Sequence, residues 1–109
     1  MKKKNIVKTK EEFNNLINGG LSKKNKYYVI YYKENNKGYD RFGISVGKKI
    51  GNAVIRNKYK RKIRSIIDIY RKSYVNSRDY IIILRSSALS ITFDEMKENL
   101  IFLLRKGEK

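Results

Sequence analysis

One segment of this 109-residue chain concentrates the residue types that bind phosphate. Between Lys48 and Lys72 there are ten Lys or Arg residues and a single acid, Asp68. Lysine and arginine neutralise phosphates and release condensed counterions, and arginine can also donate two N–H groups to one phosphate. The backbone N–H groups of the glycine-bounded loop 47–52 could contact a further phosphate. The segment therefore predicts a site for a polyanion.

A long helix predicted over residues 53–73 must position these cations. One stripe of this helix is apolar and must pack on a sheet: Ile55, Tyr59, Ile63, Ile66 and Tyr70. Another face is polar and mostly cationic, with Arg56 at its edge: Asn57, Lys60, Arg61, Arg64 and Arg71. The helix is therefore expected to be apolar toward the core and cationic toward solvent.

Three partners fit a basic helix face: solvent alone, an anionic membrane, or a nucleic acid. The net charge of +17 and the one-sided clustering argue against a merely solvated face. The helix needs its apolar stripe, which contains two tyrosines, for the only core available, and this argues against a membrane surface. A nucleic acid is the favoured partner, and no membrane partner is expected.

The remaining composition excludes several kinds of catalytic site. The chain has no Cys and no His, so disulfides, the familiar zinc sites and Ser–His or Cys–His pairs are excluded. Its ten carboxylates are scattered, and no spacing suggests a two-metal nuclease site. No apolar run approaches the roughly 20 residues that span a membrane, and the Lys-rich start lacks the apolar stretch of a secretory signal. A cytoplasmic location is expected.

The predicted elements form one domain over residues 1–109, with residues 1–8 as a flexible basic tail. Capping boxes at Thr9 and Thr92 start the first and last helices. Residues 27–32 read as a strand, residues 41–46 are expected to pair back with it as a hairpin, and the apolar run 79–84 suits a strand covered on both faces. The order helix, strand, strand, helix, strand, helix predicts an α+β protein, a two-layer α/β sandwich with a small mixed sheet.

The strand 27–32 is the second candidate binding feature. Val29 and Tyr31 share one face, whereas Tyr28, Ile30 and Tyr32 share the other. Aromatic rings on an open sheet face can stack unpaired bases, but core packing explains the same residues. If one face forms a cleft, the two interpretations divide the strand between them.

The central run closely resembles the signature of the bacterial ribonuclease P protein component. The run is Ile44-Ser45-Val46-Gly47-Lys48-Lys49-Ile50-Gly51-Asn52-Ala53-Val54-Ile55-Arg56-Asn57, continued by Lys60-Arg61 and Arg64. The order of the flanking elements fits that family over nearly the whole chain. The resemblance implies an extra short strand, a left-handed β-α-β crossover around the basic helix, and a fold like domain 2 of ribosomal protein S5.

The resemblance also implies a function that composition could not. The family is the protein subunit of an endoribonuclease whose RNA is the catalyst and which hydrolyses the 5′ leader from precursor tRNA. Mg²⁺ is bound mainly by RNA, and none is assigned to the protein, which is expected as a monomer, one per RNA. By position, the set facing the catalytic RNA is Ser45, Lys48, Lys49, Arg56, Asn57, Lys60, Arg61 and Arg64.

The family's leader-binding cleft lies between the first helix and the sheet. The matching positions here are Phe13, Ile17, Val29 and Tyr31. Two residues depart from the family pattern: Lys58 replaces an arginine, and Ile17 stands where an aromatic is common. A ribosomal or other structural RNA-binding protein without a role in cleavage, and a protein nuclease acting alone, are the alternative functions.

Overall fold

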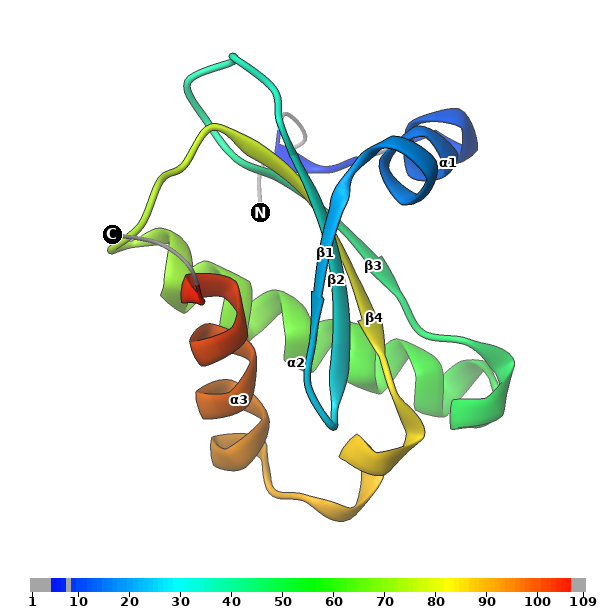
Figure 1. Cartoon of the computed structure of the whole chain (residues 1–109). Helices are drawn as coiled ribbons and strands as arrows, with labels where there is room; N and C mark the ends of the chain where they lie inside the picture. The colour runs from blue at the N-terminus through cyan, green and yellow to red at the C-terminus, as the bar shows by residue number, and fades with distance from the viewer. Residues whose placement is uncertain (1–4, 8, 107–109) are drawn as a thin grey trace.

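A four-stranded sheet carries helices on both faces (Figure 1) in the computed structural model, which describes residues 5–7 and 9–106. In chain order the elements are α1 (Lys10–Gly19), β1 (Leu21–Lys24), β2 (Tyr28–Glu34), β3 (Arg41–Ser45), the 3-10 helix η2 (Lys48–Ile50), α2 (Ala53–Arg71), β4 (Arg78–Leu84), the 3-10 helix η3 (Ser86–Ser90) and α3 (Phe93–Arg105). This confirms the α+β class and the predicted order, with β1 as the extra short strand.

The predicted helix starts are confirmed. The Thr9 hydroxyl accepts a hydrogen bond from the Glu12 N–H (3.1 Å), and the Glu12 carboxylate accepts one from the Thr9 N–H. Thr92 and Glu95 form the same reciprocal pair at the start of α3. At the start of α2, the Asn52 side-chain oxygen accepts from the Ile55 N–H at 3.1 Å. Each cap satisfies a backbone donor that has no partner inside its helix.

The strand pairing differs from the predicted hairpin. The sheet order is β1-β2-β4-β3, so β3 does not pair with β2; it pairs in parallel with β4, and the hairpin is formed by β1 and β2. The reason lies in β4, whose continuous apolar run favours a central position with both faces covered. Helix α2 connects the parallel strands β3 and β4; the left hand of this crossover stays a prediction from the resemblance.

The main core fills the space between the sheet and helices α2 and α3. Tyr28 and Ile30 of β2 are fully buried there, as expected if one face of this strand is core. The buried residues of α2 are Ile63, Ile66, Ile67 and Tyr70. Ile55, predicted on the buried stripe, is instead 39% exposed. The first turn of α2 therefore lies outside the core, whereas Tyr59, one turn later, packs against it.

A short N-terminal segment is also part of the fold. Ile6 forms a parallel bridge with Phe42, and the Asn5 side chain donates to the Asp40 carbonyl at 2.8 Å and accepts from Arg71 at 2.9 Å. Asn5 and Val7 are buried. The expectation of a loose tail over residues 1–8 is therefore wrong for residues 5–7, because hydrogen bonds to β3 and α2 hold them. Residues 1–4 and 8 lie outside the described residues.

Candidate nucleic-acid interface

The sheet face opposite the main core carries two cross-strand rows of side chains. In one row, Tyr31 of β2 lies opposite Ile81 of β4, and Ile81 lies opposite Gly43 of β3. In the next row, Val29 lies opposite Ile83, which lies opposite Ser45. Residues two apart in a strand share a face, so both rows point to the side that α1 covers.

Helix α1 covers this face only in part. Leu16 is buried against Val7 and Ile81, with Phe13 and Tyr31 packed beside them. Val29, Tyr31 and Ile83 stay half-buried, as does Phe13. The result is an apolar and aromatic surface that is partly open to solvent beside α1, which is the kind of surface on which unpaired bases can stack.

Gly43 allows this close approach of α1. A Cβ atom at position 43 would lie 2.5 Å from Cζ and 2.9 Å from Cε2 of Phe13. The phenyl ring therefore rests directly on the backbone of β3. No larger residue at position 43 leaves this ring where it is.

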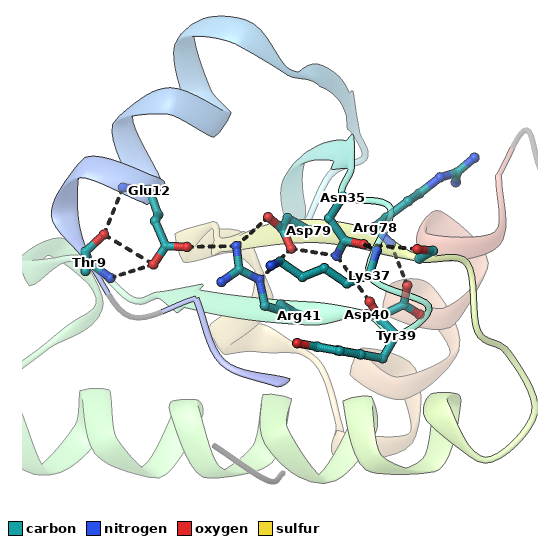
Figure 2. Close-up of polar contacts among 10 residues, drawn as sticks. Thr9, Glu12, Asn35, Lys37, Tyr39, Asp40, Arg41, Arg78 and Asp79 are labelled. Atoms are coloured by element: carbon teal, nitrogen blue, oxygen red, sulfur yellow. Dashed lines mark hydrogen bonds and ion pairs between the residues drawn. The ribbon is translucent and has the colours of Figure 1, made fainter. Parts of the chain in front are cut away.

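A chain of charged side chains fixes α1 to the sheet (Figure 2). The Arg41 guanidinium contacts the Glu12 carboxylate at 2.7 Å and binds both oxygens of Asp79, at 2.8 and 2.7 Å. The Asn35 amide also donates to Asp79, at 2.9 Å. This bidentate geometry is specific to arginine and positions the first turn of α1 over β3 and β4.

These contacts change the pKa values of both carboxyl groups. Burial alone would raise the pKa of Asp79, but the hydrogen bonds from Arg41 and Asn35 and the charge of Arg41 outweigh it, and the pKa lies below its ordinary value. The pKa of Glu12 is lowered in the same way, because its bonds to Arg41 and Thr9 outweigh burial. Both carboxylates are therefore ionised and engaged in holding α1.

The cationic face of α2 meets this surface at the edge strand β3. Arg56, Lys60 and Arg64 recur every four residues and so form one stripe of α2. Lys60 and Arg64 line a hollow of about 160 Å³ together with Phe13 and Gly43. The structure thus brings together Phe13, predicted to bind the leader, and Lys60 and Arg64, predicted to face the catalytic RNA. They meet at the edge strand β3.

The other residues predicted to face the catalytic RNA lie around this stripe. Asn57 and Arg61 are exposed on the neighbouring part of α2. Within the part of the chain that the structure describes, Arg56 Nε is buried without a hydrogen-bond partner. This atom is covered by neighbouring protein atoms, so a ligand could reach it only after the Arg56 side chain moves.

A second hollow, of about 480 Å³, lies at the C-terminal ends of β3 and β4. Its lining includes three predicted residues, Ser45, Lys48 and Lys49. It also includes four that were not predicted from the sequence: Ile83, Leu84, Arg85 and Ser86. Alternation along β4 would have placed Ile83 on this face if the pairing of β4 with β2 had been known. Ile17, by contrast, is 40% exposed and lies outside the apolar cluster around Phe13.

Fold and surface define the class of protein: a small basic α+β domain with a cationic helix beside a half-open aromatic sheet face. A family model for ribonuclease P matches residues 1–108. The chain is 42% identical to the ribonuclease P protein component of Mycoplasma mycoides, over 97% of this chain and 98% of that protein. It is 40% identical to the ribonuclease P protein component of Streptococcus pneumoniae, over 96% of this chain and 85% of that protein.

Solved structures agree. The RNase P protein of Staphylococcus aureus has a TM-score of 0.87 and 34% identity, covering 95% of each chain. The RNase P protein of Thermotoga maritima in complex with 1-(4-fluorophenyl)-2-thiourea has a TM-score of 0.86 and 30% identity, covering 94% of this chain and 99% of that one. The chain belongs to the bacterial ribonuclease P protein family. It is therefore an RNA-binding component of a tRNA-processing ribonucleoprotein.

Proposed function

We propose that this protein binds the catalytic RNA of ribonuclease P and the 5′ leader of precursor tRNA, and so assists removal of the leader. One observation carries the proposal: Phe13 and Gly43 line the same hollow as Lys60 and Arg64. A surface suited to unpaired bases therefore adjoins a surface suited to phosphates. An RNA processed at the boundary between a leader and a folded tRNA presents both features.

The two surfaces have separate tasks in this proposal. The cations of α2, with Lys48 and Lys49, neutralise phosphates of the catalytic RNA. Tyr31, Val29 and Phe13 hold leader nucleotides by stacking and apolar contact, largely without reading their sequence. Ile17, which is 40% exposed, adds van der Waals contact to the leader only.

Hydrolysis is assigned to the RNA rather than to protein side chains. The carboxylates best placed beside the candidate surface are engaged: Glu12 and Asp79 bind Arg41, and Asp40 accepts backbone N–H groups of Asn76 and Arg78. Mg²⁺ bound by RNA and substrate would supply the Lewis-acid chemistry of hydrolysis. Among the residues that the structure describes, there is no cluster of three or more His, Cys, Asp or Glu that could hold a metal ion.

The protein is proposed to act in the cytoplasm, as a monomer with one copy per RNA. Among the described residues, no helix has the length and apolar character required to cross a membrane. The net charge of +17 also opposes self-association in the absence of RNA.

Multiple-turnover cleavage of a precursor tRNA by the bacterial catalytic RNA at low Mg²⁺ tests the proposal. The expected result is strong stimulation by the protein and no cleavage by the protein alone. Tight RNA binding without stimulation would instead indicate a structural RNA-binding protein. Cleavage by RNA-free protein that is lost on substitution of an acid would indicate a protein nuclease.

The leader surface is tested by comparing precursor and mature tRNA affinity. Tyr31→Ala should reduce the preference for the precursor by about 1–3 kcal/mol, the scale of one stacked base. Tyr31→Phe keeps the ring and should retain the preference. An equal loss of affinity for both tRNAs in Tyr31→Ala would contradict the assignment of Tyr31 to the leader.

A further inference from the structure

A third hollow, of about 450 Å³, lies on the other side of the sheet from the leader surface. It is lined from the C-terminal end of α2, the loop that follows, and the C-terminal end of α3: Ser73, Tyr74, Val75, Asn76, Phe102, Arg105 and Lys106. Figure 1 shows these two helix ends beside one another. None of these residues was predicted to face the catalytic RNA or to bind the leader.

The apolar residues of this hollow are more exposed than folding requires. Phe102 is 71% exposed and Val75 is 66% exposed. The neighbouring positions of α3, Leu103 and Leu104, supply its core contacts and are fully buried. An exposed phenylalanine on the rim of a hollow adds little to stability, so its role is better sought in binding.

The floor of the hollow is held in place. The Asn76 amide donates to the hydroxyls of Tyr70 and Tyr80, at 3.0 and 3.3 Å, and its backbone N–H donates to Asp40 at 3.1 Å. The ring of Tyr74 stacks on that of Tyr70, with centroids 5.0 Å apart. A ligand would therefore meet an ordered surface and would not have to order it first.

Two cations border the aromatic rings. The Arg105 guanidinium lies 4.7 Å from the centroid of the Tyr74 ring, and Lys106 follows on the same rim. Basic residues at a helix C-terminus also offset the helix dipole, so these two alone would carry no inference. Their significance is that they share one hollow with Tyr74 and the exposed Phe102. A stacking ring beside a phosphate-binding cation matches the two parts of a nucleotide.

Charge and size narrow the choice of occupant. The described residues that line the hollow include two cations and no acid, so a second copy of this chain, also at +17, would be repelled. The volume lies within the range of about 300–1,000 Å³ that is typical of small-molecule sites. An anionic partner with a flat ring fits best, and the family is an RNA-binding one.

We propose that this hollow binds an unpaired nucleotide of RNA, with the base against the exposed ring of Phe102 and a phosphate at Arg105 and Lys106. It lies on the opposite sheet face from Tyr31, and α2, with 19 residues at 1.5 Å per residue, spans about 28 Å between its cationic start and this end. The nucleotide is therefore distinct from those in the leader surface. The inference rests on RNA binding by the family and not on the proposed leader site.

A titration of the full-length ¹⁵N-labelled protein with 5′-phosphorylated pentauridylate tests the site. Amide shifts are expected at Val75, Asn76 and Phe102, separable from those at Tyr31 and Gly43. Phe102→Ala should weaken binding at the hollow by roughly 5- to 150-fold, the scale of one stacked base, and leave the cleft-side shifts unchanged. Leu21→Ala, which removes another exposed apolar side chain, should weaken neither.

Two further variants separate binding from folding. Arg105→Gln should weaken binding at the hollow about tenfold, and Arg105→Lys should restore part of it, with unchanged circular dichroism in each case. Shifts confined to the leader side, or shifts at the hollow that Phe102→Ala does not alter, would overturn the proposal. Tighter binding there of a nonapeptide of glutamate and tyrosine than of pentauridylate would overturn it in favour of an acidic protein partner.

The source of the nucleotide follows from crosslinking in the reconstituted holoenzyme. A photoreactive benzoylphenylalanine at position 102 should crosslink to the labelled catalytic RNA or to labelled precursor tRNA, and the labelled strand identifies the source. Absence of any crosslink to either RNA would overturn the site. Because the leader preference of Tyr31 is measured separately, failure of the hollow and failure of the proposed function give different results.

Discussion

The contact between Phe13 and Gly43 gives the most direct test of how the leader surface is built. In Gly43→Ala the new Cβ would lie 2.5, 2.9 and 3.2 Å from three ring carbons, whereas ordinary contacts are 3.4–4 Å. The ring must therefore retreat by about 1 Å. Because Leu16 and the Glu12–Arg41 ion pair hold α1 down, the ring cannot move freely with the helix. Such overpacking costs about 1–3 kcal/mol.

Urea unfolding and tRNA affinity should report this change together. We expect Gly43→Ala to lower the free energy of unfolding by about 1–3 kcal/mol and to reduce the preference for precursor over mature tRNA, with affinity for the catalytic RNA retained. Replacing the ring with a smaller side chain, in the double variant Gly43→Ala/Phe13→Leu, should recover stability. The coupling energy in the double-mutant cycle should be about 0.5–3 kcal/mol. Additive effects, or an unfolding free energy within about 0.5 kcal/mol of the parent, would refute the reasoning.

Three other predictions address the cations, the acid range and the N-terminal segment. Arg61→Ala should make the log–log salt dependence of catalytic-RNA binding shallower by about 0.7–0.9, one phosphate contact, whereas Lys97→Ala on α3 should not; an unchanged slope for Arg61→Ala would remove it from the interface. The pKa values of Glu12 and Asp79 are lowered in the folded protein. Their ion pairs therefore stabilise the fold fully at pH values above the ordinary carboxyl pKa of about 4. This stabilisation is lost as the pH falls through the lowered pKa values. Between about pH 5 and pH 2, the free energy of unfolding of Asp79→Asn should therefore fall less than that of the parent protein. Parallel plots of unfolding free energy against pH for the two proteins would contradict this. Asn5→Ala should cost about 1–3 kcal/mol in urea unfolding, because the Asp40 carbonyl and one guanidinium nitrogen of Arg71 lose their bonds to Asn5, and no loss would show that residues 5–7 are dispensable.

The helices could be predicted from the sequence because their signals are local. The two capping boxes and the apolar spacing of α2 and α3 lie within one or two turns, and the structure reproduces them except at Ile55. Strand pairing depends on residues far apart in the chain, and here the prediction was wrong. A turn between two strand-like runs favours a hairpin, but the burial of β4 on both faces outweighs that local preference and places it between β2 and β3.

The candidate site shows the same division. The stripe of Arg56, Lys60 and Arg64 follows from helical spacing alone, and the face of Val29 and Tyr31 follows from strand alternation. Gly43 and Ile83 could not be assigned, because their place beside Phe13 and Val29 depends on the sheet order. The anchoring of residues 5–7 was missed because a single buried Asn leaves no periodic pattern.

Strand β3 explains why the two proposed RNA surfaces lie so close together. Its side chains alternate, so Phe42 packs in the main core between the sheet and the helices α2 and α3, while Gly43 faces Phe13 of α1. Because β3 is at the edge of the sheet, the short bridge from Ile6 is all that pairs with its outer side among the described residues, and the cations of α2 reach past that edge to the hollow beside Phe13. A bulky residue at position 43 would lift α1, and a more central β3 would separate α1 from the cations. The parallel pairing of β3 with β4, which local sequence signals did not reveal, is therefore what allows one small domain to present a stacking surface and a phosphate-binding surface at a single edge.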